Sequence, residues 1–419
     1  MVNESNELTP LNNFVSSEAP ICYGILKPGE HIPTGIPVIK VKNIKGGEVL
    51  TDDLLHTSVE IDKQYSRSKL KIGDILLTIR GTTGRVALVP KSLDNANITQ
   101  DTARIRVSTS DDSKYLFYAL HAPKVQQQID LNTVGQAVKG INISEVKKLK
   151  IFHPPLPEQR KIAEILSTWD KAISTTEKLL ETSKQQKKAL MQQLLTGKKR
   201  LGIDSDSYCF QKTRYGDIPQ DWEYPSIREI CTQFSQKNTE SKDLPVLSCS
   251  KHLGFVDSLK YFKKKVYSDD TSGYKVIPLN FFGFPSNHIE EGSIGLQRVY
   301  DKGIVSPIYV VFQSNQERVN NEYLFSLLKT EHYRQIFCAA TNASVDRRGS
   351  LRWKEFSAIH VPLPPLKEQQ KIATVLTAAD KEIEVLETKL SHFKQEKKAL
   401  MQQLLTGKRR VKIDEVEAA

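Results

Sequence analysis

Two long segments of the chain are copies of each other: PPLPEQRKIAEIL…QKKALMQQLLTGKKR at residues 154–200 and PPLKEQQKIATVL…EKKALMQQLLTGKRR at residues 364–410. The copies lie about 210 residues apart, without an insertion or deletion, and roughly 60% of their aligned positions are identical. Such a repeat divides the chain into two similar halves. Each half is a globular block followed by a long arm.

The globular blocks are related more weakly than the arms. GIPVIKVKNIKGG from Gly35 resembles DLPVLSCSKHLG from Asp243, and YLFYAL from Tyr115 resembles YLFSLL from Tyr323. Both pairs lie about 208 residues apart, close to the spacing of the arms. Because the arms have kept their sequence while the blocks have diverged, we expect the arms to meet one kind of partner surface and the blocks to meet different ones.

Each arm is predicted to be a single long helix. Pro-Pro-Leu and Glu-Gln at the start suit a helix N-terminus, and Gly197 and Gly407 suit a C-terminal cap. Between these signals, apolar residues recur at alternating spacings of four and three, which is typical of a coiled coil. The predicted seam consists of Ile162, Leu166, Trp169, Ile173, Leu180, Leu190, Leu194, Ile372, Leu376, Ile383, Leu386, Leu390, Phe393, Leu400 and Leu404.

Polar residues interrupt this seam at Ser183, Lys187 and Lys397, and such positions often fix the register of a coiled coil. The alternative is an amphipathic helix lying on its own globular core. Its length argues against this, because about 38 residues span roughly 57 Å, more than the width of a small domain. We therefore predict that the arms pair antiparallel, with one block at each end and a pseudo-two-fold relation between the halves.

The composition indicates a multidomain protein with an anionic partner. The 419 residues include 60 Lys and Arg against 49 Asp and Glu, a net charge of +11. A positive field favours polyanions, of which nucleic acid is the commonest. The five cysteines are scattered, which argues against a disulfide framework or a zinc module. With a polar N-terminal sequence and no apolar run of about 18 residues, the expected location is the cytoplasm, without a membrane partner.

The first block, up to about residue 150, reads as short strands (IPVIKV, DILLTI, RVALV and ARIRV) followed by one helix over residues 114–129. The loop RGTTGR joins two of the strands and combines arginines and hydroxyls with glycines, which allow close approach to DNA. Side-chain amides in nearby loops can read adenine. The predicted DNA contacts of this block are Lys42, Asn43, Arg80, Thr82, Thr83, Arg85, Gln100, Gln136 and Lys139.

The second block carries a comparable set of loops. YFKKKVY from Tyr261 interleaves aromatic residues with lysines, and DRRGSLRWK precedes the second arm. Arginine pairs with guanine and asparagine or glutamine with adenine, while lysine mostly contacts phosphate. The predicted contacts are Lys263, Lys264, Lys265, Ser286, Asn287, His288, Gln297, Arg298, Arg347, Arg348 and Arg352. For any one of these residues, a solvated loop position is the simpler interpretation, and the prediction rests on the loops as groups.

No catalytic motif is recognisable in the sequence. There is no phosphate-binding loop, no glycine-rich dinucleotide motif, no metal-ligand spacing and no nuclease cluster. We therefore expect no catalytic residue and no metal site. Two alternatives stay open: a coiled-coil scaffold with protein-binding domains and no DNA specificity, and an enzyme with motifs that we do not recognise.

The sequence resembles the specificity subunits of type I restriction–modification enzymes. The resemblance covers nearly the whole chain and rests on the duplicated helix openings at Leu156–Ala163 and Leu366–Ala373 and on the repeated KKALMQQLLTGK ends. The segment YGDIPQDW (Tyr215–Trp222), which leads into the second block, adds to it. The first block has no clear counterpart of this segment.

The resemblance implies an α+β protein with two tandem α/β target recognition domains separated by two long antiparallel coiled-coil helices. The domains would be residues 1–153 and 201–363, the spacer helices residues 154–200 and 364–410, and the tail residues 411–419. Each domain would read one half of an asymmetric, bipartite site in double-stranded DNA.

The resemblance also implies partners and cofactors. Two methyltransferase subunits, using S-adenosylmethionine for adenine-N6 methylation, and two ATP- and Mg-dependent restriction subunits would join this chain. The chain itself would bind no cofactor and contribute specificity without chemistry. A subunit that serves methylation alone is a further possibility.

Overall fold

The computed structural model describes residues 8–136, 139–203, 208–239, 243–251, 253–341 and 350–412. The chain forms two compact units: unit 1 comprises residues 1–177 and 388–419, and unit 2 comprises residues 178–387. Both boundaries fall inside the predicted arms. Each unit therefore contains one globular block together with a part of each long helix.

Unit 1 is built on a four-stranded antiparallel sheet. Its strands, in spatial order, are β2 (Cys22–Tyr23), β10 (Thr102–Ile105), β7 (Ile75–Thr78) and β8 (Val86–Leu88). The other strands are β6 (Leu55–Thr57), β3 (Ile36–Ile39) and β9 (Asn97–Ile98) in one sheet, β4 (Ile44–Lys45) with β5 (Glu48–Val49), and β1 (Leu8–Pro10) with β11 (Lys150–Phe152).

The four-stranded sheet of unit 1 is buried on both faces, because its residues alternate between two hydrophobic clusters. Ile75 and Leu77 face the cluster that includes α2 (Ser113–His121) and the long helices, whereas Leu76 faces the cluster under β3 and β9. The remaining helices of the block are α1 (Val59–Gln64), α3 (Pro123–Leu131) and α4 (Ile143–Lys148).

The prediction of a single helix over residues 114–129 was wrong, because the structure has two helices there. Ala122, between α2 and α3, has an extended backbone, with φ −62° and ψ 137°. Proline at the next position disfavours helical geometry in the residue before it, and Pro123 itself is well suited to a first helical turn. Proline therefore ends one helix and begins the next.

Unit 2 has a matching four-stranded antiparallel sheet. Its strands are β14 (Cys231–Phe234), β21 (Tyr309–Ser314), β18 (Phe282–Pro285) and β19 (Gly295–Leu296). Three strand pairs accompany it: β15 (Leu247–Ser250) with β16 (Gly254–Asp257), β17 (Lys275–Pro278) with β20 (Lys302–Val305), and β12 (Phe210–Thr213) with β13 (Gly216–Pro219). Its short helices are α6 (Ile227–Ile230), α7 (Ser258–Phe262), α8 (Asn321–Leu328), α9 (Glu331–Ala340) and α10 (Trp353–Phe356).

Each arm is one unbroken helix, α5 (Leu156–Leu194) and α11 (Leu366–Leu404), each of 39 residues. Both helices are followed by the predicted glycine in the left-handed conformation, with φ +69° at Gly197 and φ +68° at Gly407. The backbone N–H groups of Lys199 and Arg409 close these ends by donating to carbonyls six residues earlier. The helix ends therefore lie where the local sequence places them. None of the described helices has the length and apolar character needed to cross a membrane.

The predicted seam residues are all buried or half-buried in the structure. Outside the seam, Leu179 and Val385 are 51% and 64% exposed. In unit 1 the seam includes an edge-to-face contact between the rings of Trp169 and Phe393, whose centroids are 5.5 Å apart. The predicted seam positions are thus less exposed than these two apolar positions outside the seam.

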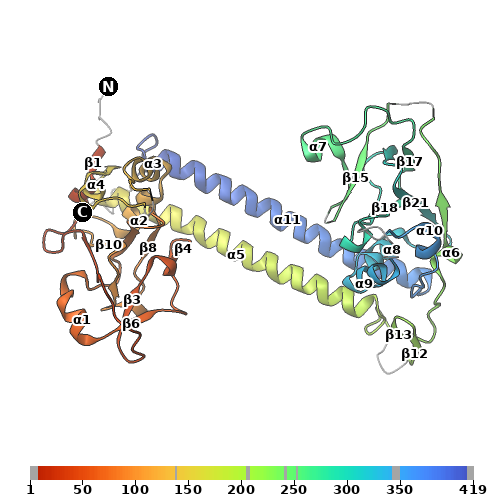
Figure 1. Cartoon of the computed structure of the whole chain (residues 1–419), viewed down its shortest axis with the longest axis horizontal. Coiled ribbons are helices and arrows are strands. Elements are labelled where there is room, and N and C mark those ends of the chain that lie inside the picture. Colours follow the sequence, from red (N-terminus) through yellow and green to blue (C-terminus); the bar gives the residue numbers. More distant parts are fainter. Residues whose placement is uncertain are drawn as a thin grey trace. The chain divides into compact units, whose positions relative to one another are not determined.

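Ion pairs show that the helices run antiparallel within each unit, where they lie side by side (Figure 1). In unit 1, Lys394 of α11 pairs with Glu177 of α5 at 2.7 Å, and Lys397 pairs with Asp170 at 2.5 Å. The partner on α5 thus moves toward the start of that helix as the position on α11 moves toward its end. In unit 2 the order is the same, with Lys184 paired to Glu387 and Lys187 paired to Asp380. The seam lysines are therefore neutralised by carboxylates of the opposite helix.

A buried glutamine joins the first turn of each long helix to its recognition domain. The Gln159 amide oxygen accepts from the backbone N–H of Asp112 at 2.9 Å, and its NH₂ group donates to Pro154 O at 2.9 Å. Gln369 repeats this arrangement, accepting from Asn320 N at 2.8 Å and donating to Pro364 O at 2.8 Å. Since Asp112 and Asn320 cap α2 and α8, each glutamine links two helix starts.

Candidate DNA interface

In unit 1, three predicted loops meet beyond the ends of β7 and β10. The N–H of Gly81 donates to Lys139 O at 2.9 Å, which joins the RGTTGR loop to the loop before α4. The Arg80 guanidinium donates to Gln100 Oε1 at 3.3 Å. Arg80, Thr82, Gln136 and Lys139 are exposed, and Thr83 and Gln100 are half-buried. Residues distant in sequence thus form one polar edge with arginine, lysine, amide and hydroxyl groups.

The two glycines of RGTTGR are required by its backbone. Gly81 and Gly84 have φ of +73° and +84°, a conformation that side chains rarely adopt. A Cβ on Gly84 would also lie 2.7 Å from the amide oxygen of Gln126, whose NH₂ group donates to Gly84 O. Helix α3 therefore supports this loop from behind, which leaves Thr82 facing solvent.

Two residues predicted as DNA contacts in unit 1 have structural roles instead. Asn43 is 3% exposed, accepts from Lys40 N at 3.0 Å and donates to Asp53 O at 3.1 Å. Arg85 turns inward and donates to the carbonyls of Val41 and Ile44 at 3.3 and 3.1 Å. The prediction was wrong for Asn43 because a polar side chain in a turn satisfies the backbone before any ligand. Arg85 is likewise used to hold the turn.

Lys42 lies on the same turn, and its ammonium group is exposed and paired with Asp53. The lysine hydrogen bond lowers the pKa of the Asp53 carboxyl. An exposed pair of this kind contributes little to stability and can exchange for a phosphate contact. Lys42 therefore stays a predicted phosphate contact.

Unit 2 places its loops in the same way as unit 1. The N–H of Leu351 donates to Ser286 O at 2.8 Å, just as the N–H of Ile141 donates to Ile79 O at 2.9 Å in unit 1. In both units the segment after the third strand of the four-stranded sheet thus meets the segment before a short helix. Asn287 carries an amide oxygen that is shielded from solvent and has no partner among the described residues, and Arg352 beside Leu351 is exposed.

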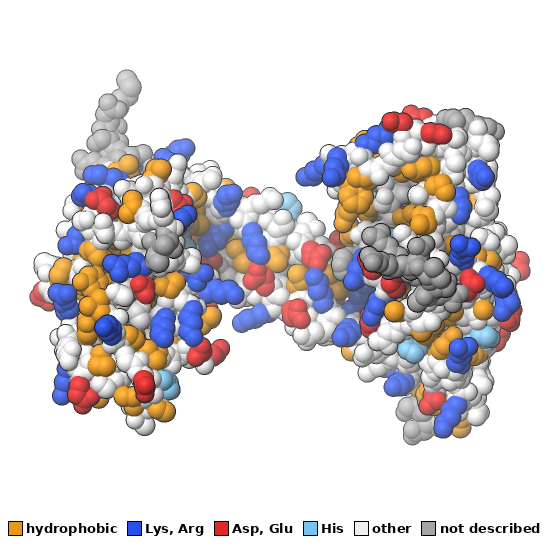
Figure 2. Space-filling view, in the orientation of Figure 1, with side chains coloured by type: hydrophobic (Ala, Val, Ile, Leu, Met, Phe, Trp, Pro, Cys, Tyr) orange, Lys and Arg blue, Asp and Glu red, His pale blue; other side chains and the backbone are white. Residues whose placement is uncertain are grey.

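The predicted lysines of unit 2 lie at the C-terminal end of α7. Lys263, Lys264 and Lys265 are exposed, and Lys265 pairs with Asp269. Figure 2 shows the basic side chains projecting at this corner of the unit. Lys263 has φ +53°, the left-handed geometry that ends α7, so the chain turns there and spreads the three side chains. Flexible exposed lysines suit phosphates rather than bases.

The prediction for Gln297 was wrong, because its side chain is fully buried. Its amide oxygen accepts from Val299 N at 2.6 Å, and its NH₂ group donates to Ile277 O at 3.4 Å. Gln297 therefore organises a turn inside the domain. The neighbouring Arg298 is exposed, pairs with Glu322 and stacks over the Phe325 ring at 4.9 Å. The predicted contacts Arg347 and Arg348 lie outside the described residues.

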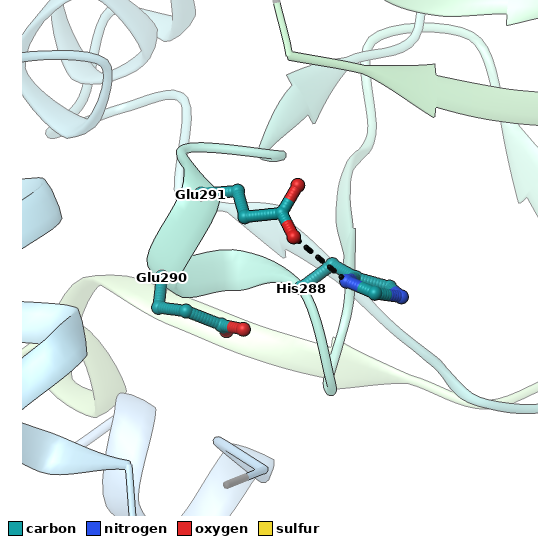
Figure 3. Close-up of side chains that lie close together, drawn as sticks. All are labelled: His288, Glu290 and Glu291. Atoms are coloured by element: carbon teal, nitrogen blue, oxygen red, sulfur yellow. Dashed lines mark hydrogen bonds and ion pairs between the residues drawn. The ribbon is translucent and has the colours of Figure 1, made fainter. Parts of the chain in front are cut away.

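His288 has acidic neighbours, as Figure 3 shows. Its Nδ1 lies 3.2 Å from Glu291 Oε1, and the ligand atoms of His288, Glu290 and Glu291 fall within 4.8 Å of one another. All three belong to the 3-10 helix Ile289–Glu291 or precede it directly. The carboxylates of Glu290 and Glu291 would repel a DNA phosphate. If DNA contacts this point, the carboxylates would instead accept from a base amino group, such as cytosine N4.

The helix ends hold a set of paired residues that the sequence pattern did not single out. Arg410 pairs with Glu158 at 2.7 Å in unit 1, and Arg200 pairs with Glu368 at 2.6 Å in unit 2. The hydrogen bonds that Arg200 donates to the Glu368 carboxylate raise the pKa of Arg200. The repeat contained the necessary signal, because these glutamates and arginines are identical in both arms. Their pairing could not be read from spacing within one arm.

Comparison with known proteins places this architecture in a family. The profile of the type I restriction modification DNA specificity domain matches residues 29–184 and 219–395. A putative type I restriction enzyme MjaX specificity subunit from Methanocaldococcus jannaschii is 28% identical over 404 residues, covering 90% of this chain and 88% of that protein. The EcoBI specificity subunit of Escherichia coli is 35% identical over 167 residues, covering 39% and 34% of the two chains.

Solved structures support the same fold. The crystal structure of a type I restriction–modification S subunit from M. genitalium covers 97% of this chain and 98% of its own, with a TM-score of 0.56 and 16% identity. An HsdS subunit from Thermoanaerobacter tengcongensis has a TM-score of 0.50 at 16% identity, covering 96% and 97%. With the two profile matches over most of its length, the chain belongs to the family of type I restriction–modification DNA specificity subunits.

Proposed function

We propose that each unit reads one half of a bipartite target in double-stranded DNA through the loops beyond its four-stranded sheet. The observation that carries this proposal is the repeated loop junction, Ile141 to Ile79 in unit 1 and Leu351 to Ser286 in unit 2. The same backbone arrangement presents different side chains in the two units. Arg80 and Lys139 in unit 1 contrast with Asn287 and Arg352 in unit 2, so the two half-sites would differ in sequence.

The second part of the proposal concerns the long helices as a two-fold-related, antiparallel coiled coil with partner subunits on its outer surface. Lys188, Gln192 and Gln193 are exposed on α5, and the residues 210 positions later, Lys398, Gln402 and Gln403, are identical and exposed on α11. Intramolecular packing does not account for identity at exposed positions, whereas two copies of one partner would. The exposed apolar side chains of Leu179 and Val385 add surface that a partner could bury.

In this proposal the partners are two methyltransferase subunits and two restriction subunits, and the chemistry belongs to them. The methyltransferase would use S-adenosylmethionine, and the restriction subunits would use ATP and Mg. This chain would supply the DNA sequence specificity and the scaffold. A scaffold without DNA specificity is not favoured by the family assignment.

Methylation-sensitive long-read sequencing tests the proposal. DNA would be compared from cells that express the chain with its neighbouring methyltransferase gene and from cells that lack only this chain. The expected result is a new bipartite motif with methyladenine in both halves. An active methyltransferase that produces no motif dependent on this chain would overturn the proposal.

A further inference from the structure

A basic cavity lies in unit 1, formed by residues around β2, β10 and the start of α4. Its volume is about 530 Å³, which is within the usual range for a small-molecule site. The cationic residues that line it are Arg67, Lys69, Lys71, Arg104, Arg106 and Lys147. One acidic residue, Glu18, also lines it.

Two of these cations are neutralised by carboxylates. Lys69 pairs with Asp62 at 2.9 Å, and Arg106 donates to both oxygens of Asp74, at 2.8 and 2.7 Å. For the other four cations, no salt bridge occurs among the described residues. Even with Glu18 counted, the cavity therefore carries an excess of positive charge that the domain does not balance.

Arg104 is the residue of this cavity that points most strongly to an anionic ligand. The residue is only 2% exposed, and its guanidinium donates to a carbonyl, Pro20 O at 2.9 Å, and weakly to the Cys22 sulfur at 3.5 Å. Its Nε–H is shielded from solvent and has no hydrogen-bond partner among the described residues. Buried guanidinium groups are ordinarily paired with an anion, because an unpaired buried charge is costly.

The fold does not need a cation at this position. Arg104 is the third residue of β10, where it faces Cys22 on β2 and Leu76 on β7. The third residue of β21, in the matching sheet of unit 2, is Val311, which is fully buried in an apolar cluster. A valine thus fills the corresponding place in one unit, and the arginine of the other calls for a different explanation.

We propose that this cavity binds a phosphate group, with Arg104 in its wall and Arg67 and Lys147 at its rim. Guanidinium groups match the geometry of phosphate oxygens, and a phosphate brings negative charge to these cations, one charge in a DNA phosphodiester and nearly two in a terminal phosphate group. The phosphate belongs either to a small phosphorylated ligand or to the DNA backbone. With a small phosphorylated ligand the inference is independent of the proposed function, whereas with DNA it rests on that function.

The first test is calorimetric titration of the full chain with inorganic pyrophosphate and with ADP. The double variant R67Q/K147Q removes two rim cations without entering the core. K148Q is a matched control, since Lys148 is adjacent on α4 but pairs with Glu145 outside the cavity. If the phosphate comes from a small ligand, we expect the unchanged chain and K148Q to bind a probe and R67Q/K147Q to bind it at least tenfold more weakly.

The second arm measures binding of a random-sequence DNA duplex over a range of salt concentrations. If the phosphate belongs to DNA, R67Q/K147Q should reduce the magnitude of the slope of log K against log salt by about 1–2. The reduction in K148Q should be less than half of that in R67Q/K147Q. Identical behaviour of R67Q/K147Q and K148Q in both arms would overturn the proposal.

The variant R104M tests the buried cation itself. We expect it to fold with a melting temperature at or above that of the unchanged chain and to lose the phosphate effect seen in either arm. Should R104M fold and keep that effect, Arg104 is not part of the site and the proposal fails. Should it fail to fold, the rim variants still decide the outcome.

Discussion

At the scale of single residues, His121 at the end of α2 links stability to pH. Burial lowers its pKa from 6.5, and nearby Lys397 acts in the same direction, while the bond to Phe117 O at 2.9 Å opposes the shift. The unfolded chain therefore takes up this proton more readily than the folded chain. The contribution of neutral His121 to stability is therefore fully present above pH 6.5 and is lost as the pH falls below that value.

The variant H121L removes this proton uptake. Chemical denaturation between pH 8 and pH 5 should show a smaller loss of unfolding free energy for H121L than for the unchanged chain. His332 is exposed on α9, and H332L is the control, with the pH dependence of the unchanged chain. Equal slopes for H121L and H332L would contradict the buried, neutral state of His121.

The proposed function leads us to expect that Arg80 of unit 1 contacts a base. It is exposed at the loop junction, and its only acceptor among the described side chains is Gln100, at 3.3 Å. We expect R80A to weaken binding to a duplex that contains the target motif, as identified by methylation sequencing, by about 1–3 kcal/mol, as for a lost bidentate base contact. Binding measured by fluorescence anisotropy checks this, with R160A, an exposed arginine of α5, as the control. Equal losses in both variants would remove Arg80 from the base contacts.

At the scale of elements, the buried glutamines make the joints between long helices and recognition domains. Replacing Gln159 by alanine leaves the N–H of Asp112 and the Pro154 carbonyl without their partner. The expected loss is about 1–3 kcal/mol of unfolding free energy for unit 1. Q193A, at an exposed glutamine of α5, should have no measurable effect in the same denaturation experiment. A neutral Q159A would mean that water replaces the amide.

At the scale of the whole molecule, the proposed function predicts that helix length sets the spacer between half-sites. Seven residues inserted after Glu177 in α5 and after Glu387 in α11 keep the heptad pattern and lengthen each helix by about 10 Å. We expect unchanged half-site sequences separated by a spacer longer by about three base pairs, measured by methylation sequencing. Altered half-sites would show that the helices also shape the reading loops.

Much of the architecture could be predicted from the sequence because its signals are local. The repeat, the seam period and the glycines at 197 and 407 each act within a few residues, and the observed helices follow them. The break at Pro123 has an equally local cause, and the prediction of one helix over residues 114–129 did not include it. The structure contradicts the predicted DNA contacts at Asn43, Arg85 and Gln297, and the other predicted contacts stay predictions, since polar residues in loops serve either the backbone or a ligand.

The sequence by itself determined the two halves, their long helices and the family to which the chain belongs. Only the tertiary structure decided which polar residues are buried and bonded within the domain, as Asn43 and Gln297 are, and which face solvent, as Arg80 does. It also brought Glu158 to Arg410 and left Arg104 buried without a carboxylate. These outcomes depend on contacts between residues far apart in the chain, and a sequence pattern within one segment does not predict such contacts.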